Sequence, residues 1–353
     1  MKDLLFISSH QFGYLIDTYE YCKYLNRFYK ITILCYDKGY SKQTIENVKV
    51  IYVNHSRLKI FRIILFLIKA VFLSLINKGF IFVVYFPHVG ILKKILFWKK
   101  MHLDIRSLSV SPDVTQRISF NNDLFRSVTL FDSVSAISKG VINKIPSAKY
   151  ISLLPLGADI FSKTKKKYEK LNILYVGTLY NRNIIKTVIA FDRFKKNHPE
   201  ITMHYDIVGD GGKEFDEIKN YIETNSIDDS ITMHGRIIHD ELKPFFDKCN
   251  IGVSFVPITD YYDNQPPTKT FEYVLSGIYT IGTATTANRE IINDLNGCLV
   301  EDTINDFLSA LENIVLIRDR FDSDIIRASL CDFTWKNIID NYLIPILERY
   351  ETK

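Results

Sequence analysis

Two charged residues, Lys269 and Glu272, stand three positions apart just after the proline pair Pro266-Pro267. Proline fits the first turn of a helix, where its missing N–H costs nothing, so the pair predicts a helix with Pro267 at its first position. An ammonium beside free backbone N–H groups can bind phosphate, and a carboxylate on the same helix face can accept hydrogen bonds from a ribose diol. The pattern suits a sugar nucleotide, and the same spacing also fits an ordinary helix with a surface Lys–Glu pair worth ~0.2–0.5 kcal/mol.

The neighbouring segments predict how this pair is positioned. A buried strand, Ile251–Val256, comes first and leads into the polar loop Pro257–Gln265. Gly277 ends the helix, and the strand Tyr279–Thr283 follows at once. Three backbone N–H groups at the helix start would face the mouth of the sheet, those of Thr268, Lys269 and Thr270.

The amino-terminal part has the β-α-β pattern of a parallel, doubly wound sheet. A strand at Leu4–Ser8 is followed by a helix at Leu15–Phe28 and a second strand at Ile31–Tyr36. Gly13 stands alone in the first turn, where a dinucleotide fingerprint would require G-x-G-x-x-G. The sequence therefore predicts a Rossmann-like sheet without that fingerprint.

Length and composition predict two globular domains in a reducing compartment. The chain has 353 residues, which is too long for one ordinary core. Of these residues 47% are hydrophobic and 24% charged, a composition typical of globular proteins. Its five cysteines form no C-x-x-C pair, so neither a disulfide scaffold nor a zinc site is expected. The start, MKDLLFISSHQFG, is too short and too polar for a signal peptide.

Charge is unevenly distributed along the chain. Residues 1–163 carry a net charge of +13 and the remainder −8, which predicts that the first part faces an anionic surface. The basic residues accompany apolar ones in Leu58–Asn77 and Ile91–Lys100, so a membrane is favoured over nucleic acid as the partner. Charges at a bilayer centre cost ~2.5–3.5 kcal/mol each, which favours a helix lying in the interface over one that spans the membrane. A helix sandwiched in the core is the alternative.

The run PPTKTFEYVLSGIYTIGT resembles the P-x-K-x-x-E-Y…G-x-P-V-I-x-T block of family 4 glycosyltransferases, which have the GT-B fold. Other segments are similar to family elements: LFDSVSAIS (130–138), SLLPLGAD (152–159, with Leu156 in place of Asn), NILYVG (172–177) and ITMHGR (231–236). The resemblance is strong over 172–300 and looser before it. It implies an α/β protein with two Rossmann-like domains facing across a cleft and a C-terminal helix that crosses back to the first domain.

The resemblance also implies which residues hold a nucleotide diphosphate sugar. Lys269, Glu272 and Arg182 are expected to carry catalysis, with Lys269 and Arg182 on the diphosphate and Glu272 on the ribose. The family commonly has an arginine after the glycine of NILYVG, but Thr178 stands there, so Arg182 is assigned the phosphate role; a surface arginine is the alternative. The expected nucleotide-sugar-binding residues are Gly177, Thr178, Gly209, Arg236, Thr268, Thr270 and Asn264.

One departure from the family pattern leaves the identity of the sugar open. Asn264 occupies the position of the proximal carboxylate in the family's E-x7-E pair, and Asp263 is a candidate replacement. On the sugar and acceptor side, the resemblance points to residues of the first domain, namely Gly13, His88, Asp104 and Arg106. A plain turn glycine and a structural histidine are the alternatives for the first two.

These observations predict an acceptor-binding, membrane-facing domain at 1–165, a nucleotide-sugar-binding domain at 166–334 and a crossover helix at 335–353. The expected activity is retaining transfer of a hexosyl or N-acetylhexosaminyl group to a lipid-linked saccharide, in O-antigen, capsule or exopolysaccharide assembly. No metal or other cofactor is expected, and the protein is expected to lie on the inner face of the cytoplasmic membrane. A GT-B nucleotide-sugar epimerase and a catalytically inactive sugar-nucleotide-binding subunit remain as alternatives. The base, UDP or GDP, stays open.

Overall fold

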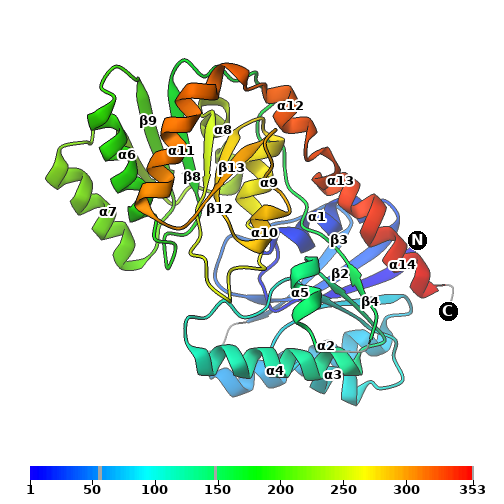
Figure 1. The fold of residues 1–353 in the computed structure, drawn as a ribbon. Helices are drawn as coiled ribbons and strands as arrows, with labels where there is room; N and C mark the ends of the chain where they lie inside the picture. Colours follow the sequence, from blue (N-terminus) through cyan, green and yellow to red (C-terminus); the bar gives the residue numbers. More distant parts are fainter. Residues whose placement is uncertain (55–57, 147–148, 352–353) are drawn as a thin grey trace. The chain divides into compact units, whose positions relative to one another are not determined.

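The computed structural model describes residues 1–54, 58–146 and 149–351, which form two compact α/β units (Figure 1). Unit 1 comprises Met1–Leu156 and Trp335–Lys353, and unit 2 comprises Gly157–Thr334. The chain therefore passes from one unit to the other after Leu156, earlier than the predicted boundary after residue 165.

The segment 163–170, KTKKKYEK, has a basic, polar composition that predicts an exposed linker, but it belongs to unit 2 and is partly buried there. Lys166 is only 7% exposed, and its ammonium donates to the carbonyls of Phe246 and Asp247 at the end of a short helix. The expectation of a solvated linker is thus wrong at Lys166, because a helix C-terminus offers carbonyl oxygens that a lysine satisfies.

Unit 1 is built on a seven-stranded, wholly parallel sheet in the order β3-β2-β1-β4-β5-β6-β7. Its strands are β1 (Lys2–Ile7), β2 (Tyr29–Asp37), β3 (Val48–Asn54), β4 (Phe80–Val84), β5 (His102–Ile105), β6 (Ser133–Ala136) and β7 (Ile151–Leu153). The central strand β4 is a continuous apolar run that is wholly buried, as a sheet covered by helices on both faces requires.

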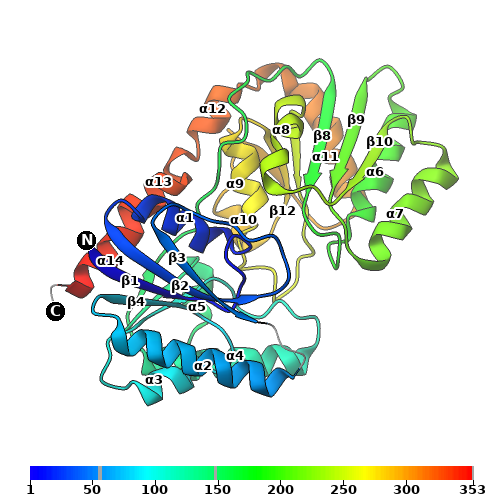
Figure 2. The ribbon, with the colours of Figure 1, turned by 180° about the vertical axis from the view of Figure 1, so that it is seen from behind.

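The helices of unit 1 connect these strands. They are α1 (Ile16–Leu25), α2 (Lys59–Ile76), α3 (Gly90–Ile95), α4 (Val114–Leu130) and α5 (Lys139–Lys144), joined by α13 (Trp335–Ile338) and α14 (Ile344–Glu351). Helices α2, α3 and α4 lie next to one another on one side of the sheet, and α1 lies on the other (Figures 1 and 2). This two-sided cover is the doubly wound arrangement that the β-α-β pattern predicts.

The C-terminal segment packs on unit 1, where Trp335 meets the ring of Tyr21 edge-on at 6.1 Å. It is not one regular α-helix, since a π-helical turn at Ile339–Leu343 separates α13 from α14. Pro345 follows that turn and has no N–H to donate to the preceding turn, which gives a physical reason for the irregularity.

Unit 2 contains a six-stranded, wholly parallel sheet in the order β10-β9-β8-β11-β12-β13. Its strands are β8 (Leu171–Val176), β9 (Met203–Val208), β10 (Ile231–Gly235), β11 (Ile251–Ser254), β12 (Tyr279–Thr283) and β13 (Gly297–Val300). Its α-helices are α6 (Ile185–Asn197), α7 (Gly212–Asn225), α8 (Lys243–Lys248), α9 (Thr268–Leu275), α10 (Thr286–Arg289), α11 (Ile304–Ile317) and α12 (Ser323–Ala328). Short 3-10 turns lie at His239–Glu241, Arg318–Arg320 and Cys331–Phe333. The strand order reverses direction between β8 and β11, and the crevice at the carboxyl ends of such strands is where this fold binds ligands.

Helix α9 is held against β8 and β11 by Tyr273, the tyrosine that follows Glu272. The backbone N–H of Val176 in β8 donates to the Tyr273 hydroxyl at 2.8 Å. Gly252 in β11 leaves room for the Tyr273 ring, because a Cβ at position 252 would lie 2.5 Å from a ring carbon. The helix begins one residue later than predicted, with Pro267 as the N-cap and Thr268 as the first helical residue.

Candidate functional site

Two cations converge beside the carboxyl end of β8, each against an aromatic ring. The Lys269 ammonium, from α9, lies 3.8 Å from the centroid of the Tyr175 ring in β8. The Arg182 guanidinium, from the loop before α6, lies 4.3 Å from the centroid of the Tyr262 ring. Within the described part of the chain, neither cation forms a salt bridge. A cation held on an aromatic face keeps its N–H donors available for an anion.

The electrostatics of Lys269 favour an anionic ligand. Burial lowers the pKa of Lys269 well below its ordinary value, the nearby Arg182 lowers it further, and Glu272 opposes both effects. An anion bound between the two cations would relieve their repulsion and restore the charged form of Lys269.

The start of α9 supplies two further donors. Across the described residues, the N–H groups of Thr268 and Lys269 have no hydrogen-bond partner, as expected at a helix N-terminus. Thr270 differs from its prediction as a ligand residue, because its N–H donates to the Pro267 carbonyl at 3.1 Å. Its hydroxyl is buried, 2.6 Å from the Ser254 hydroxyl, so Thr270 fastens α9 to β11.

Glycines keep this corner open. Gly177, at the end of β8, has φ +143°, and a Cβ there would lie 3.1 Å from the Lys269 ammonium. Gly209 plays a supporting part, since a Cβ on it would lie 1.8 Å from the Gly177 carbonyl oxygen. The exposed Thr178 accepts a hydrogen bond at its carbonyl from the Tyr175 hydroxyl at 2.6 Å, which fixes the loop beside Lys269. Around this corner of unit 2 the structure thus brings together six predicted residues, namely Lys269, Arg182, Thr268, Gly177, Thr178 and Gly209.

Glu272 lies deeper along α9 and faces a residue that the sequence did not single out. Its side chain is 9% exposed, and its Oε1 lies 3.5 Å from Nε2 of His239, in the turn after β10. Arg236, in the same connection after β10, is exposed. No spacing rule marked His239, because its proximity to Glu272 arises only when β10 and α9 take their places around the sheet.

Asp263, the candidate replacement for the missing proximal carboxylate, is bonded to the start of α10. Its two oxygens accept from the N–H of Thr286 at 2.8 Å and from the Thr286 hydroxyl at 2.7 Å, at the start of α10. Asn264 is buried, and its amide donates to Asp263 at 3.3 Å. The loop before α9 is thus tied to α10, and position 264 presents an amide.

In unit 1, Asp104 and Arg106 form a buried ionic cluster. Arg106 pairs with Asp17 of α1, lies 3.7 Å from Asp104 and donates to the Leu154 carbonyl at 2.8 Å. Burial raises the pKa of Asp104 to about 6, while Arg106 and the Ser135 hydroxyl hold it down. Asp104 is 0% exposed and Arg106 9%, so the structure places both inside the unit rather than on a surface that could contact a sugar.

The other two unit 1 residues lie in loops after central strands. His88, after β4, is exposed and adopts a left-handed conformation, with φ 68°, while its N–H donates to Asp123 of α4 at 2.8 Å. Gly13, after β1, has φ 88°, and a Cβ there would lie 2.4 Å from the side chain of Gln43. Both loops follow carboxyl ends of adjacent strands, where His88 remains accessible.

Apolar side chains are exposed along α2 and the segment around α3, and we call them the apolar face of unit 1. Its members are Leu58, Ile60, Phe61, Ile64, Ile68, Phe72, Leu75, Ile76, Ile91, Ile95, Phe97 and Trp98. Lys99 joins the two segments, since its ammonium donates to the Asn77 carbonyl at the end of α2 at 3.2 Å. The alternative of a helix sandwiched in the core is therefore wrong for α2, because much of its apolar surface is exposed.

The charges around the apolar face are not equivalent. Lys94 and Lys100 are exposed, whereas Lys93 is 5% exposed and forms a 2.8 Å ion pair with Asp132. Lys93 is thus a structural residue and not the surface charge that the sequence suggested. Among the described residues, none of the helices combines the length and hydrophobicity needed to cross a membrane.

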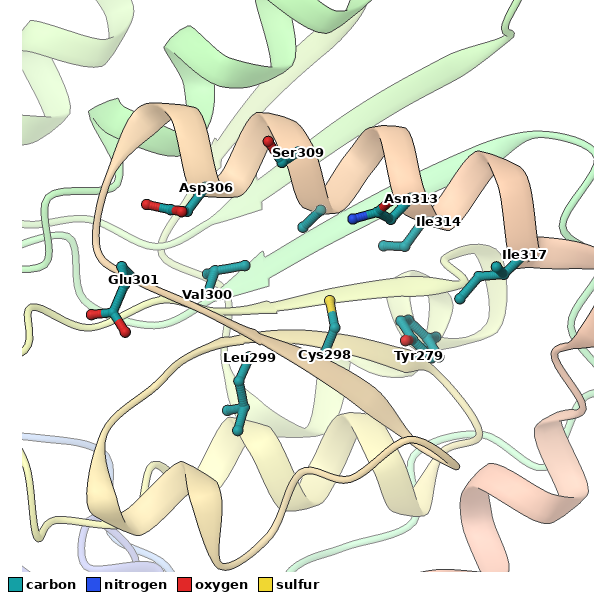
Figure 3. Close-up of a pocket in the computed structure, with 11 residues that line it drawn as sticks. Tyr279, Cys298, Leu299, Val300, Glu301, Asp306, Ser309, Asn313, Ile314 and Ile317 are labelled. Carbon is teal, nitrogen blue, oxygen red and sulfur yellow. The ribbon is translucent and has the colours of Figure 1, made fainter.

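A cavity of about 330 Å³ lies elsewhere in unit 2, between α11 and the edge strand β13 (Figure 3). Asp306 and Glu301 stand at one end of it, Ser309 and Asn313 project from α11, and Cys298 points from β13 (Figure 3). The lining has carboxylates and no cation, so this cavity does not suit a phosphate. None of the predicted site residues lines it. Over the described chain, no group of three or more His, Cys, Asp and Glu side chains is arranged to hold a metal ion.

Residues 170–316 match the family model described as Glycosyl transferases group 1. Sucrose-phosphate synthase from Thermosynechococcus elongatus has a similar structure, with a TM-score of 0.79, 16% identity and coverage of 100% of this chain and 99% of that one. Anabaena HepE in complex with UDP and glucose gives 0.76 at 11% identity over 100% of both chains. The lipopolysaccharide outer core galactosyltransferase WaaB gives 0.69 at 16% identity, over 99% of this chain and 100% of that one. No curated protein matches the chain.

At these identities the structural likeness establishes the fold, and it confirms the predicted α/β architecture of two Rossmann-like domains. The family match lies entirely within unit 2, which carries the cation pair. Together these findings give the chain the two-domain GT-B fold, and residues 170–316 of its second unit are similar to the group 1 glycosyl transferases.

Proposed function

We propose that this glycosyltransferase moves a hexosyl or N-acetylhexosaminyl group, with retention of configuration, from a nucleotide diphosphate sugar to a lipid-linked saccharide. The convergence of Lys269 and Arg182 beside the free N–H groups at the start of α9 carries this proposal. Anabaena HepE, whose structures contain UDP or UDP-glucose, supports a nucleotide-sugar donor. Assembly of a bacterial surface polysaccharide is the proposed context, which the likeness to WaaB supports.

The proposed chemistry is electrostatic. Departure of the sugar places negative charge on the nucleoside diphosphate, and Lys269, Arg182 and the N–H groups of α9 would stabilise that charge without a metal ion. Glu272 would bind the ribose hydroxyls and take no covalent part. Pre-organised donors contribute most at charge that develops in the transition state, so their loss should lower turnover more than ground-state binding.

A membrane surface is proposed for the acceptor side. The apolar face of unit 1 offers side chains that can enter the headgroup region, and the sequence has no acidic residue between Glu46 and Asp104. Exposed lysines such as Lys94 and Lys100 would add ~1 kcal/mol each near anionic lipid. Binding by this face at the cytoplasmic side would bring unit 1 to a lipid-linked acceptor.

The decisive experiment incubates the protein with radiolabelled UDP- and GDP-sugars and a membrane lipid extract, followed by phase separation. Label in the lipid phase supports transfer, and Lys269→Met provides the matched inactive control. A new free nucleotide sugar would instead indicate an epimerase. Donor that binds without conversion would indicate an inactive binding subunit. Two observations favour this alternative: position 264 lacks the proximal carboxylate, and its candidate replacement Asp263 is bonded to α10.

A further inference from the structure

His239 lies among three carboxylates on the floor of the candidate site. Its Nε2 lies 3.5 Å from Glu272 Oε1 and 3.9 Å from Asp159 Oδ2, and its Nδ1 lies 3.9 Å from Asp240 Oδ1. The ring packs edge-on against Phe161, with centroids 4.7 Å apart. His239 is thus the point at which the turn after β10 meets the face of α9 that carries Glu272.

The Phe161 ring beside His239 is packed and hydrogen-bonded to neighbouring elements. Phe161 stacks on Phe246 of α8 at 4.4 Å, and its backbone N–H donates to the hydroxyl of Ser276, just after α9, at 3.1 Å. An imidazole packed on such a ring has few alternative rotamers. Contact with it therefore limits the positions that the Glu272 side chain can adopt.

The surrounding charges favour the imidazolium. Burial alone would lower the pKa of His239, but Glu272, Asp159 and Asp240 outweigh burial and raise it above the ordinary value of 6.5. The 3.5 Å approach is an ion-pair distance rather than a short hydrogen bond. The His239 ring contacts one oxygen of Glu272, so the carboxylate can still accept further hydrogen bonds.

We infer that His239 is a positioning residue, which holds the Glu272 carboxylate in the orientation that accepts hydrogen bonds from the ribose hydroxyls of the donor nucleotide. This inference rests on the proposed function, because it assigns the nucleoside end of the same site. Lys269 and Glu272 lie one helical turn apart on α9, which places diphosphate and ribose contacts in succession along one helix. His239 then sets how strictly the site requires a 2′-hydroxyl.

The test compares UDP and GDP with their 2′-deoxy counterparts by calorimetry. Wild-type protein should prefer the ribonucleotide, since a carboxylate built to accept a hydroxyl is left unpaired by the deoxy analogue. In His239→Phe, which keeps the packing on Phe161, the preference should fall by at least about fivefold. His239→Gln, which restores an N–H donor, should recover part of it. The donor KM should rise in His239→Phe with little change in kcat.

His198→Phe is the matched control. His198 stacks on Phe194 at 4.5 Å and lies 3.4 Å from Glu200, a similar arrangement at the end of α6. The His198→Phe variant should leave the preference for the ribonucleotide unchanged. If His239→Phe keeps the full preference, or weakens both nucleotides equally, His239 does not position Glu272 and the inference is overturned. If wild-type protein binds neither UDP nor GDP, the proposed function itself fails, and with it the inference.

Discussion

Replacing Lys269 by methionine is the most direct test of the phosphate site. Methionine preserves an unbranched side chain against the Tyr175 ring, which the ammonium approaches to 3.8 Å, but removes the charge. Loss of one pre-organised donor at developing charge costs ~10²–10³ in turnover, or ~2.7–4 kcal/mol. Within the described chain no carboxylate forms a salt bridge with Lys269, so a bound diphosphate would be its anionic partner and would favour its charged form. We therefore expect a loss of at least ~10²-fold, with Arg182 accounting for residual activity.

Initial rates with a radiolabelled donor measure this loss, and thermal unfolding serves as the control for folding. Burial disfavours the charged form of Lys269, so Lys269→Met should be no less stable than the wild type. Lys269→Arg keeps the charge and should retain more activity than the methionine variant. Unchanged turnover in a folded Lys269→Met protein would remove Lys269 from the mechanism.

The same residue should couple donor binding to proton uptake. Burial and Arg182 lower the pKa of Lys269 in the free protein, and a bound diphosphate should raise it again. Nucleotide affinity should therefore fall as pH rises between these two values, by up to about tenfold per pH unit. Calorimetry in two buffers of different ionisation enthalpy should detect uptake in the wild type and not in Lys269→Met. An equal pH slope in both proteins would refute the assignment.

Three further perturbations test other parts of the structure. The double variant Lys94→Glu, Lys100→Glu should release the protein from anionic vesicles, because it removes two attractions of ~1 kcal/mol each. Vesicle flotation measures this release, and undiminished binding would contradict docking by the apolar face. Burial lowers the pKa of Lys166 from 10.5 to about 8, so the folded state is penalised at low pH and relieved as pH rises from about 8 to 10.5. Thermal unfolding should therefore show wild-type stability rising across that window relative to Lys166→Met, whereas parallel curves would contradict the burial. Gly177→Ala should weaken UDP binding, because it strains a backbone at φ +143° by ~1–3 kcal/mol and crowds the site. Gly39→Ala, at φ +83° with open space around it, should share the strain without affecting UDP.

Local patterns in the sequence predicted the elements near the site well. The proline pair, Lys269 and Glu272 indicated a helix start with a charged face, and α9 begins within one residue of the prediction. Such features follow from interactions within one or two turns of helix, which the sequence encodes directly. The mixture of basic and apolar residues in Leu58–Asn77 likewise predicted an interfacial helix, and α2 exposes an apolar side.

Periodicity could not decide which polar residues are buried. Lys93 and Lys166 look like surface charges in the sequence, yet each is buried against acceptors from distant segments, Asp132 for the former and the end of α8 for the latter. Asp104 and Arg106 have the spacing of a sugar-binding element, but they neutralise each other inside unit 1 together with Asp17. A buried charge requires a partner, and that partner is fixed by the order of strands in the sheet.

By itself, the sequence determined that a helix start carrying a lysine and a carboxylate would lie between two buried parallel strands, because the necessary interactions are local. Only the tertiary structure decided what surrounds that start. Tyr175 in β8, Arg182 in the loop before α6 and His239 in the turn after β10 lie beside Lys269 or Glu272. Contacts over such separations depend on how the whole of unit 2 packs its hydrophobic core, so no short motif specifies them.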